Sequence, residues 1–290
     1  MRISMAPAVL AATTALLLLA GCTAGVGSLG TDKSGELGTT VGNSLASYQV
    51  IDLASGAVTQ RDSIADLATN DAYRTTSLVF RRIDGGSYQV GAAAGELGAQ
   101  SDEAQSTRTV EHFYIGVFEV TQAQWQRLST LAGTASTPWT AVTPSSVAGG
   151  ASADLPAYGV SQQVATQLLA QVPWHNLALP SALQWEVAAR GGATTAFAWG
   201  AQTDEATVAP RALVAETNGG ATGPEAVGAL LPNAFGLYDM HGNVWELTGD
   251  GFIHGGSWHD TVIQARSANR VALDPTTPHA LVGVRLVFLP

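Results

Sequence analysis

Hydrophobic and polar positions in this chain alternate over short stretches, a pattern typical of half-buried β-strands. Strands are predicted over residues 48–53, 57–59, 78–83, 112–120 and 282–288. The turn sequence Asp84-Gly85-Gly86 predicts that residues 87–90 return as the hairpin partner of the 78–83 strand. We expect the last of these strands to be central in its sheet.

Three helices are predicted from the capping residues that precede them. Thr121 with Gln124 and Ser181 with Gln184 form capping boxes, and Ser161 caps a helix between them. Two consecutive glycines end the third helix, and the chain beyond them is predicted to be loop-rich with no further helix. Because the strands are not separated by regular helices, the pattern favours an α+β domain over a doubly wound α/β sheet.

The composition describes an acidic chain that is able to bury a sizeable hydrophobic core. It has 290 residues, of which 46% are hydrophobic, and a formal net charge of -10 with a single lysine, Lys33. Nucleic acid is excluded as the main partner, because neutralising phosphates needs clustered Lys and Arg. The single cysteine, Cys22, excludes an intrachain disulfide and a metal site built from several cysteines.

The N-terminal residues are predicted to be an export signal that ends in a lipid attachment site. Residues 9–20 form an apolar run that is too short for a bilayer-spanning helix, which needs ~20 residues. The run ends in Leu19-Ala20-Gly21-Cys22, which resembles the lipobox of bacterial lipoproteins, where the cysteine thiol is acylated. Because Thr and not Asp follows the cysteine, the resemblance implies an exported lipoprotein anchored to the outer membrane. The alternative is an ordinary signal peptide with an incidental cysteine.

Composition divides the chain into four parts. Residues 1–21 are the predicted lipoprotein signal peptide, residues 22–46 a lipidated N-terminus and flexible tether, residues 47–77 an N-terminal strand extension, and residues 78–290 the main domain. The tether contains a formal G-x-G-x-x-G match at residues 25–30. A dinucleotide site needs a strand before such a match and a helix after it, so we expect no cofactor there.

An ordered set of motifs runs through the main domain. They are F-R-R-I-D-G-G-S-Y-Q-V-G at 80–91, F-E-V-T at 118–121, L-P-S-A-L-Q-W-E-V-A-A-R-G-G at 179–192, P-N-A-F-G-L-Y-D-M-H-G-N-V-W-E at 232–246, G-G-S-W at 255–258 and G-V-R at 283–285. Together these motifs resemble the formylglycine-generating enzyme family, also called the sulfatase-modifying-factor domain. The resemblance implies a C-type-lectin-like α+β fold, rich in loops, with short mixed strands and about three short helices.

The resemblance also implies calcium, because members of this family bind calcium through oxygen atoms of loops, the ligand type that suits a hard cation. It implies Asn218 as a side-chain ligand of one site. It implies a second site made by the carbonyls of Gly242 and Val244 with the side chains of Asn243 and Glu246. The alternative is that Asn243 and Glu246 only bond to nearby backbone.

The family's oxidases use two cysteines after the G-G-S-W segment to bind copper and convert a sulfatase cysteine to formylglycine. Sulfur is the ligand type that holds Cu(I). In this chain Asp260 stands at the first position and Ala265 near the second, so neither copper nor the family's oxidase chemistry is expected. His241, His254 and His259 with Asp260 offer the ligand types of a replacement iron site. The alternative is that they are polar residues on the rim of a cleft.

Two classes of function follow from these observations. The first is a lipid-anchored, non-catalytic envelope protein whose domain binds or scaffolds another envelope protein, a peptide or a glycan. Its contact surfaces would be the irregular stretches at 132–160, predicted to be a surface excursion, and at 248–280. The second is a divergent formylglycine-generating-type or non-heme metal oxidoreductase that acts on a protein or a small molecule. Bound iron or copper would favour the second class.

Overall fold

The computed structural model describes residues 45–142, 152–173 and 176–289 of the chain. The predicted signal peptide, Cys22 and nearly all of the predicted tether lie outside these residues. No helix in the described part of the chain is long and apolar enough to cross a bilayer.

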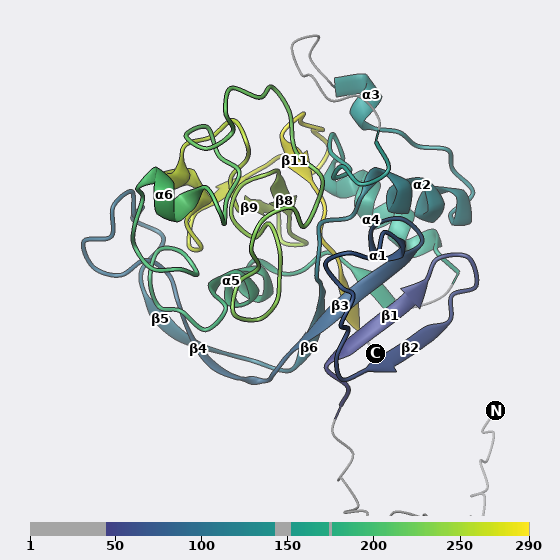
Figure 1. Ribbon diagram of the computed structural model, residues 1–290, viewed down its shortest axis with the longest axis horizontal. Helices are drawn as coiled ribbons and strands as arrows, with labels where there is room; N and C mark the ends of the chain where they lie inside the picture. The colour runs from purple at the N-terminus through teal and green to yellow at the C-terminus, as the bar shows by residue number, and fades with distance from the viewer. Residues whose placement is uncertain (1–44, 143–151, 174–175, 290) are drawn as a thin grey trace, which may run out of the picture. The chain divides into compact units, whose positions relative to one another are not determined.

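The largest element of the fold is a six-stranded sheet with the strand order β2-β1-β3-β6-β12-β7 (Figure 1). All of its pairings are antiparallel. The predicted N-terminal extension supplies β2, at one edge of this same sheet, and β1 beside it, and the strand predicted at 112–120 is shortened to four residues. The strands are β1 (Tyr48–Asp52), β2 (Val58–Arg61), β3 (Ser77–Ile83), β6 (Phe113–Gly116), β7 (Asn176–Ala178) and β12 (Val287–Leu289).

Two smaller sheets are a four-stranded one with the order β10-β9-β8-β11 and the pair β4-β5. The predicted hairpin between residues 78–83 and 87–90 is wrong: both edges of β3 are already taken by β1 and β6, so β4 pairs with β5. The strands are β4 (Gly86–Val90), β5 (Ser106–Val110), β8 (Trp245–Leu247), β9 (Phe252–His254), β10 (Arg270–Ala272) and β11 (Val282–Gly283).

The three predicted helices are present, with the caps that the sequence indicates. The side chains of Thr121, Ser161 and Ser181 each accept a backbone N–H of the first turn, and Gly191 ends the third helix with φ 57°. A short helix after Gly191, capped by Asp204, was not predicted. The helices are α1 (Ala72–Thr75), α2 (Gln122–Leu131), α3 (Trp139–Val142), α4 (Gln162–Gln171), α5 (Ala182–Arg190) and α6 (Glu205–Val208), with a 3-10 turn η1 (Val262–Ala265).

The centre of the six-stranded sheet is buried on both faces, whereas β2 at its edge is exposed. Successive side chains of a strand point to opposite faces, and β6 and β12 lie side by side with Tyr114 opposite Phe288 and Ile115 opposite Val287. Tyr114 and Phe288 belong to the core that includes α2 and α4, whereas Ile115 and Val287 belong to the core that includes α5. Figure 1 accordingly shows α2 and α4 on one side of β3 and β6, and α5 on the other.

Two irregular regions differ from expectation. The C-terminal segment is not a single central strand, because β11 lies at the edge of the four-stranded sheet and β12 inside the six-stranded one, with residues 284–286 crossing between them. The C-terminal end of the predicted surface excursion lies in the protein interior, since Ala157, Tyr158 and Val160 are buried in the core that includes α2.

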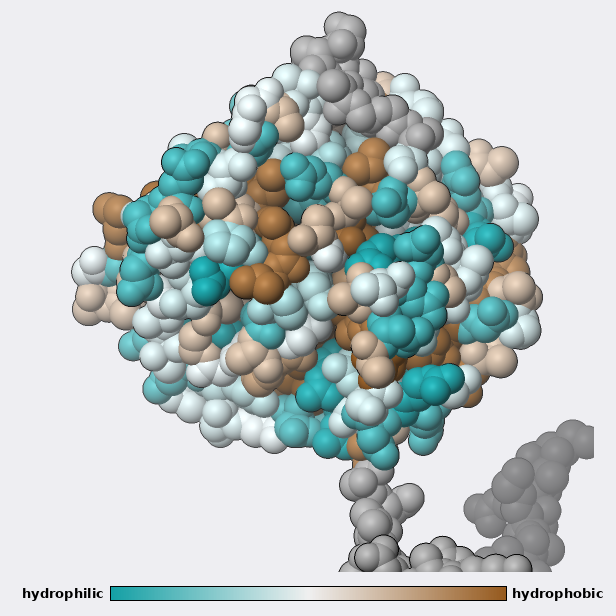
Figure 2. All heavy atoms as spheres, viewed as in Figure 1, coloured by the Kyte–Doolittle hydropathy of each residue, from teal (hydrophilic) through white to brown (hydrophobic). Residues whose placement is uncertain are grey.

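The face seen in Figure 2 is mostly neutral or hydrophilic, with hydrophobic side chains gathered near its middle.

Candidate functional site

The loop after the G-G-S-W segment contains the two positions at which the resemblance to the family's oxidases implies cysteine. At the first, the half-buried Asp260 carboxylate accepts hydrogen bonds from the indole N–H of Trp245 (2.8 Å) and from the hydroxyl of Ser257. At the second, Ala265 is fully buried, and its carbonyl oxygen lies 2.7 Å from Nδ1 of His241. A carboxylate held by two donors and a buried methyl group therefore occupy the two positions.

Two glycines set the shape of this loop. Gly255 and Gly256 have φ of 95° and 73°, in the left-handed region that glycine adopts without steric cost. A Cβ on Gly256 would lie 3.0 Å from the backbone of Ala265, so the loop returns on itself at a distance that excludes a side chain. This close return brings Ser257 and Asp260 to the end of β8.

Four charged side chains are buried together near β8: Glu119, Asp239, Glu246 and Arg285. Arg285 donates hydrogen bonds to both carboxylate oxygens of Glu246, at 2.6–3.0 Å. Burial raises the pKa of Glu119 well above its ordinary value, and the charges of Asp239 and Glu246 raise it further. Burial also raises the pKa of Asp239, to about 6. Three carboxyl groups thus surround one guanidinium.

Glu246, which the resemblance implies as a calcium ligand, takes part in this ion pair. One of its oxygens also accepts the indole N–H of Trp185 at 2.5 Å. Both oxygens are therefore already bound by donors of the protein, and the nearest charge is the cation of Arg285. The geometry gives Glu246 a structural role in this ion pair, and its expected role as a calcium ligand stays a prediction.

The other predicted side-chain ligands, Asn218 and Asn243, meet at Trp258. The side-chain amide of Asn218 donates to the Trp258 carbonyl, and the Asn243 carbonyl accepts the Trp258 N–H, both at 2.9 Å. The Asn243 side chain donates to Glu119 (2.7 Å) and accepts the backbone N–H of Glu225 (3.0 Å). The contact with Glu225 is to backbone, as the alternative expects, whereas the contact with Glu119 is to a side chain. Calcium binding by the predicted side chains and by the carbonyls of Gly242 and Val244 stays a prediction.

The histidines that were considered for an iron site are held apart by separate contacts. Both ring nitrogens of His241 form hydrogen bonds with backbone groups. His254 is buried and stacks on Trp185, with ring centres 4.8 Å apart. His259 is exposed. Burial lowers the pKa of His241 to about 4 and that of His254 to about 3, so both are neutral at pH 7. Within the described ranges, no three His, Cys, Asp or Glu side chains converge as a ligand set.

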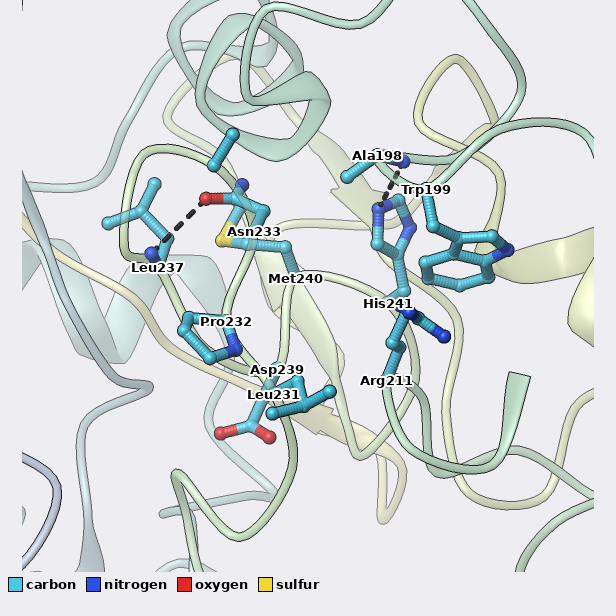
Figure 3. Close-up of a pocket in the computed structure, with 11 residues that line it drawn as sticks. Ala198, Trp199, Arg211, Leu231, Pro232, Asn233, Leu237, Asp239, Met240 and His241 are labelled. Atoms are coloured by element: carbon cyan, nitrogen blue, oxygen red, sulfur yellow. Dashed lines mark hydrogen bonds between the residues drawn. The ribbon is translucent and has the colours of Figure 1, made fainter. Parts of the chain in front are cut away.

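A cavity of about 260 Å³ lies beside His241. Its walls come from residues 198–199, Arg211 and the segment 231–241, and neither Asp260 nor Ala265 lines it. In Figure 3, Pro232 and Leu237 lie on one side of the cavity, and Trp199, Arg211 and His241 on the other. This cavity is therefore separate from the two cysteine positions.

Asn233 holds the loop that forms one wall of this cavity. Its side-chain oxygen accepts the backbone N–H groups of Phe235 and Leu237, and its amide nitrogen donates to the carbonyls of Ala188 and Ala189 at the end of α5. A turn is thus attached to a helix C-terminus, where unpaired carbonyls require donors. The sequence P-N-A-F-G-L therefore produces a rigid wall.

Sequence reasoning did not assign Glu119, Asp239 or Arg285 to a site, although each lies in or beside a recognised motif. The signal for two of them was available: Glu119 and Arg285 interrupt hydrophobic runs, and a charge in a buried strand needs a partner. Arg211 carries no such signal, because its place in the cavity wall depends on contacts between segments that are distant in sequence.

The fold and the loop at 255–265 define a loop-rich α+β domain of the formylglycine-generating-enzyme class in which other residues stand at the two cysteine positions. A family model described as the sulfatase-modifying factor enzyme 1-like domain matches residues 65–289. The chain belongs to this family.

Two curated relatives are formylglycine-generating enzymes. That of Mycobacterium tuberculosis is 35% identical over 144 residues, which are 45% of this chain and 47% of the relative. That of Thermomonospora curvata is 33% identical over 123 residues, which are 38% of this chain and 37% of the relative. The matches thus span about half or less of these enzymes' length.

Solved structures share the fold. PvdO from Pseudomonas aeruginosa has a TM-score of 0.63 at 22% identity, covering 73% of this chain and 94% of PvdO. Treponema denticola variable protein 1 has a TM-score of 0.60 at 19% identity, covering 74% of this chain and 96% of that protein. At these identities the likeness establishes the C-type-lectin-like architecture alone.

Proposed function

We propose that this chain is a lipid-anchored envelope protein whose domain lacks oxidase activity and serves as a binding or scaffold module. The proposal is supported by Asp260, which stands where the resemblance implies the first cysteine, and by Ala265, which stands near the implied second one. A carboxylate held by Trp245 and Ser257, next to a buried methyl group, offers no sulfur ligand for Cu(I). The sequence contains no cysteine other than Cys22.

Cys22 is the proposed lipid attachment site, and residues 23–46 are the proposed tether to the outer membrane. As a flexible coil, this tether would have a reach on the order of 25–30 Å. Of the proposed contact stretch at 248–280, the part that is almost continuously exposed is 271–279. A partner such as an envelope protein, a peptide or a glycan would meet the domain within this distance of the bilayer.

The non-catalytic role is tested with the detergent-extracted mature protein. We expect elemental analysis to find neither stoichiometric copper nor iron. We also expect mass spectrometry to find no formylglycine after incubation with Cu(I), oxygen and a peptide that carries a sulfatase cysteine motif. The double variant Asp260→Cys/Ala265→Cys is the matched comparison, because it restores sulfur at both positions. Conversion of the peptide by the unmodified protein would establish the oxidoreductase alternative instead.

The lipid anchor is tested separately, in cells fed an alkyne-bearing fatty acid. We expect the unmodified protein to incorporate the label and to fractionate with the outer membrane, and Cys22→Ala to do neither. An unlabelled, released wild-type protein would establish the ordinary signal peptide. The result does not depend on the metal analysis.

A further inference from the structure

We propose that the cavity beside Trp199 and Arg211 binds a carboxylate attached to an apolar group, such as the C-terminal residue of a peptide or a free aliphatic acid. The inference rests on the proposed binding function and names the ligand chemistry that this module recognises. Four features of the described residues carry it: the satisfied polar groups of the wall, the unpaired arginine, the apolar rim and the size of the cavity.

Most polar side chains of the wall already have their hydrogen-bond partners inside the protein. Both ends of the Asn233 amide are used by backbone groups, and the Trp199 indole N–H donates to the Gln202 carbonyl at 3.1 Å. His241 donates from Nδ1 to the Ala265 carbonyl and accepts the Ala198 N–H at Nε2, which fixes a neutral ring. These groups therefore have few hydrogen-bond donors or acceptors left to offer a ligand.

Arg211 is the exception in this wall. Of its five N–H donors, one is used by the Thr207 carbonyl at 2.7 Å. Among the residues that the structure describes, no carboxylate forms an ion pair with Arg211. A half-buried guanidinium with free donors therefore faces the cavity, and Asp239, the acidic residue that also lines it, forms no ion pair with Arg211.

Asp239 also lines the cavity but is bound elsewhere. One of its oxygens accepts the Gly228 N–H, and its main electrostatic partners are Arg285 and Glu246. In Figure 3 its carboxylate points away from Arg211. The positive charge at the Arg211 end of the cavity is thus not compensated, and an anionic group of a ligand would lie at that end.

The rest of the lining favours an apolar group. Leu231, Pro232 and Ala234 line the cavity with exposed apolar side chains next to the indole of Trp199, and Leu231 at its edge is 56% exposed. A leucine this exposed gains free energy when a ligand removes its surface from water, at about 25 cal/mol per Å². The ligand would place its apolar part here and its charge on Arg211.

Charge and size narrow the anion to a carboxylate. A guanidinium binds carboxylates and phosphates in bidentate fashion, but a single arginine neutralises one charge, and the chain as a whole carries a net charge of -10. A phosphate dianion would keep one uncompensated charge in this acidic protein, whereas a carboxylate keeps none. A volume of about 260 Å³ accommodates one residue-sized group.

The test compares N-acetyl-L-leucine with N-acetyl-L-leucinamide, which differ only in the negative charge. Binding to the detergent-extracted mature protein is followed by two-dimensional NMR on the Trp199 indole N–H, assigned through Trp199→Phe. We expect a saturable shift with the acid at millimolar concentration and at least ~10-fold weaker binding of the amide. Equal affinities for the two, or no saturable shift at ~10 mM acid, would overturn the proposal.

Variants locate the anion. We expect Arg211→Gln to weaken binding of the acid at least ~10-fold and Arg61→Gln, an exposed arginine on β2, to leave it unchanged. If Arg211→Gln does not fold, Leu231→Asp and Leu231→Asn serve instead, because position 231 is exposed. Leu231→Asp should weaken binding of the acid and not of the amide, whereas Leu231→Asn should weaken binding of both to the same extent. If neither Arg211→Gln nor Leu231→Asp changes the affinity for the acid, the assignment of the anion to Arg211 is contradicted.

Two further ligands distinguish the sources of the carboxylate. Recognition of a peptide C-terminus is supported if the peptide Gly-Gly-Gly-Leu binds at least as tightly as N-acetyl-L-leucine and if amidation of its C-terminus abolishes this binding. Binding of N-acetyl-L-leucine alone supports a free acid. If none of these ligands binds, the inference of a carboxylate site is overturned. The lipid anchor and the absence of oxidase activity are not affected by that result, because separate experiments test them.

Discussion

Arg285 and Glu246 form an ion pair that is completely buried and that joins the two larger sheets. Arg285 lies on the segment that crosses from β11 to β12, and Glu246 lies on β8. The same guanidinium donates to the carbonyls of Gly116, on β6, and Tyr238. One side chain therefore connects the end of the six-stranded sheet, the four-stranded sheet and the loop before the cavity.

Breaking this pair should destabilise the domain strongly. We expect Glu246→Gln to lower the free energy of unfolding by about 3 kcal/mol, because a buried guanidinium loses its counter-charge. Arg285→Met should cost more, since it leaves two carbonyls and the Glu246 carboxylate without this donor and removes the positive charge beside Glu119 and Asp239. Urea unfolding followed by tryptophan fluorescence measures both. The exposed pair Arg82–Asp84 provides the control: Asp84→Asn should change stability by less than ~1 kcal/mol.

Asp239→Asn should change how stability depends on pH. Burial raises the pKa of Asp239 from its ordinary 3.8 to about 6, so the folded state binds this proton more tightly than the unfolded state. This contribution to stability is present at pH 4 and is lost as the pH rises through about 6. Asparagine keeps an acceptor for Gly228 and tolerates the φ of 58°.

Urea unfolding at pH 4 and pH 7, on wild type and Asp239→Asn, measures this effect. On raising the pH, wild type should lose on the order of 2–3 kcal/mol more than the variant. Comparing the two proteins cancels the opposite contribution of the buried histidines, whose lowered pKa values favour folding at higher pH. Identical pH dependence in the two proteins would contradict the buried, protonated Asp239.

Calcium should stabilise the domain without using Glu246. We expect a midpoint of thermal unfolding roughly 5 °C higher in excess calcium than in a chelator. Glu246→Gln should retain this difference at a lower midpoint, because both Glu246 oxygens are bound by Arg285 and Trp185. Asn218→Ser should reduce the difference, and Asn70→Ser, which removes comparable local hydrogen bonds, should not. An unchanged midpoint on chelation excludes calcium.

Removing a helix cap should have a smaller and purely local effect. Ser181 accepts the backbone N–H of Gln184, whose side chain accepts the N–H of Ser181 in return. We expect Ser181→Ala to lower the free energy of unfolding by ~1 kcal/mol. Ser106→Ala, at an exposed position of β5, should change it by less than ~0.5 kcal/mol. Equal effects of the two substitutions would mean that the capping box contributes nothing measurable.

Local signals in the sequence predicted the helices and several strands correctly. Caps such as Thr121 and Ser181, and the left-handed Gly191, act within one turn of backbone, so neighbouring residues are enough to specify them. The pairing of β4 with β5 in place of β3 could not be predicted in this way. It depends on β1 and β6 having filled both edges of β3, which is a property of the assembled sheet.

The sequence alone determined the family, through ordered motifs, and the absence of cysteine from the positions of Asp260 and Ala265. Both are properties of residue identity and spacing. Only the tertiary structure decided that Glu246 is bound to Arg285, which lies 39 residues further along the chain, and that Arg211 faces a cavity without forming an ion pair with any described carboxylate. Burial and pairing depend on segments that meet only when the chain is folded, and these contacts decide whether a charged side chain is structural or free to bind a ligand.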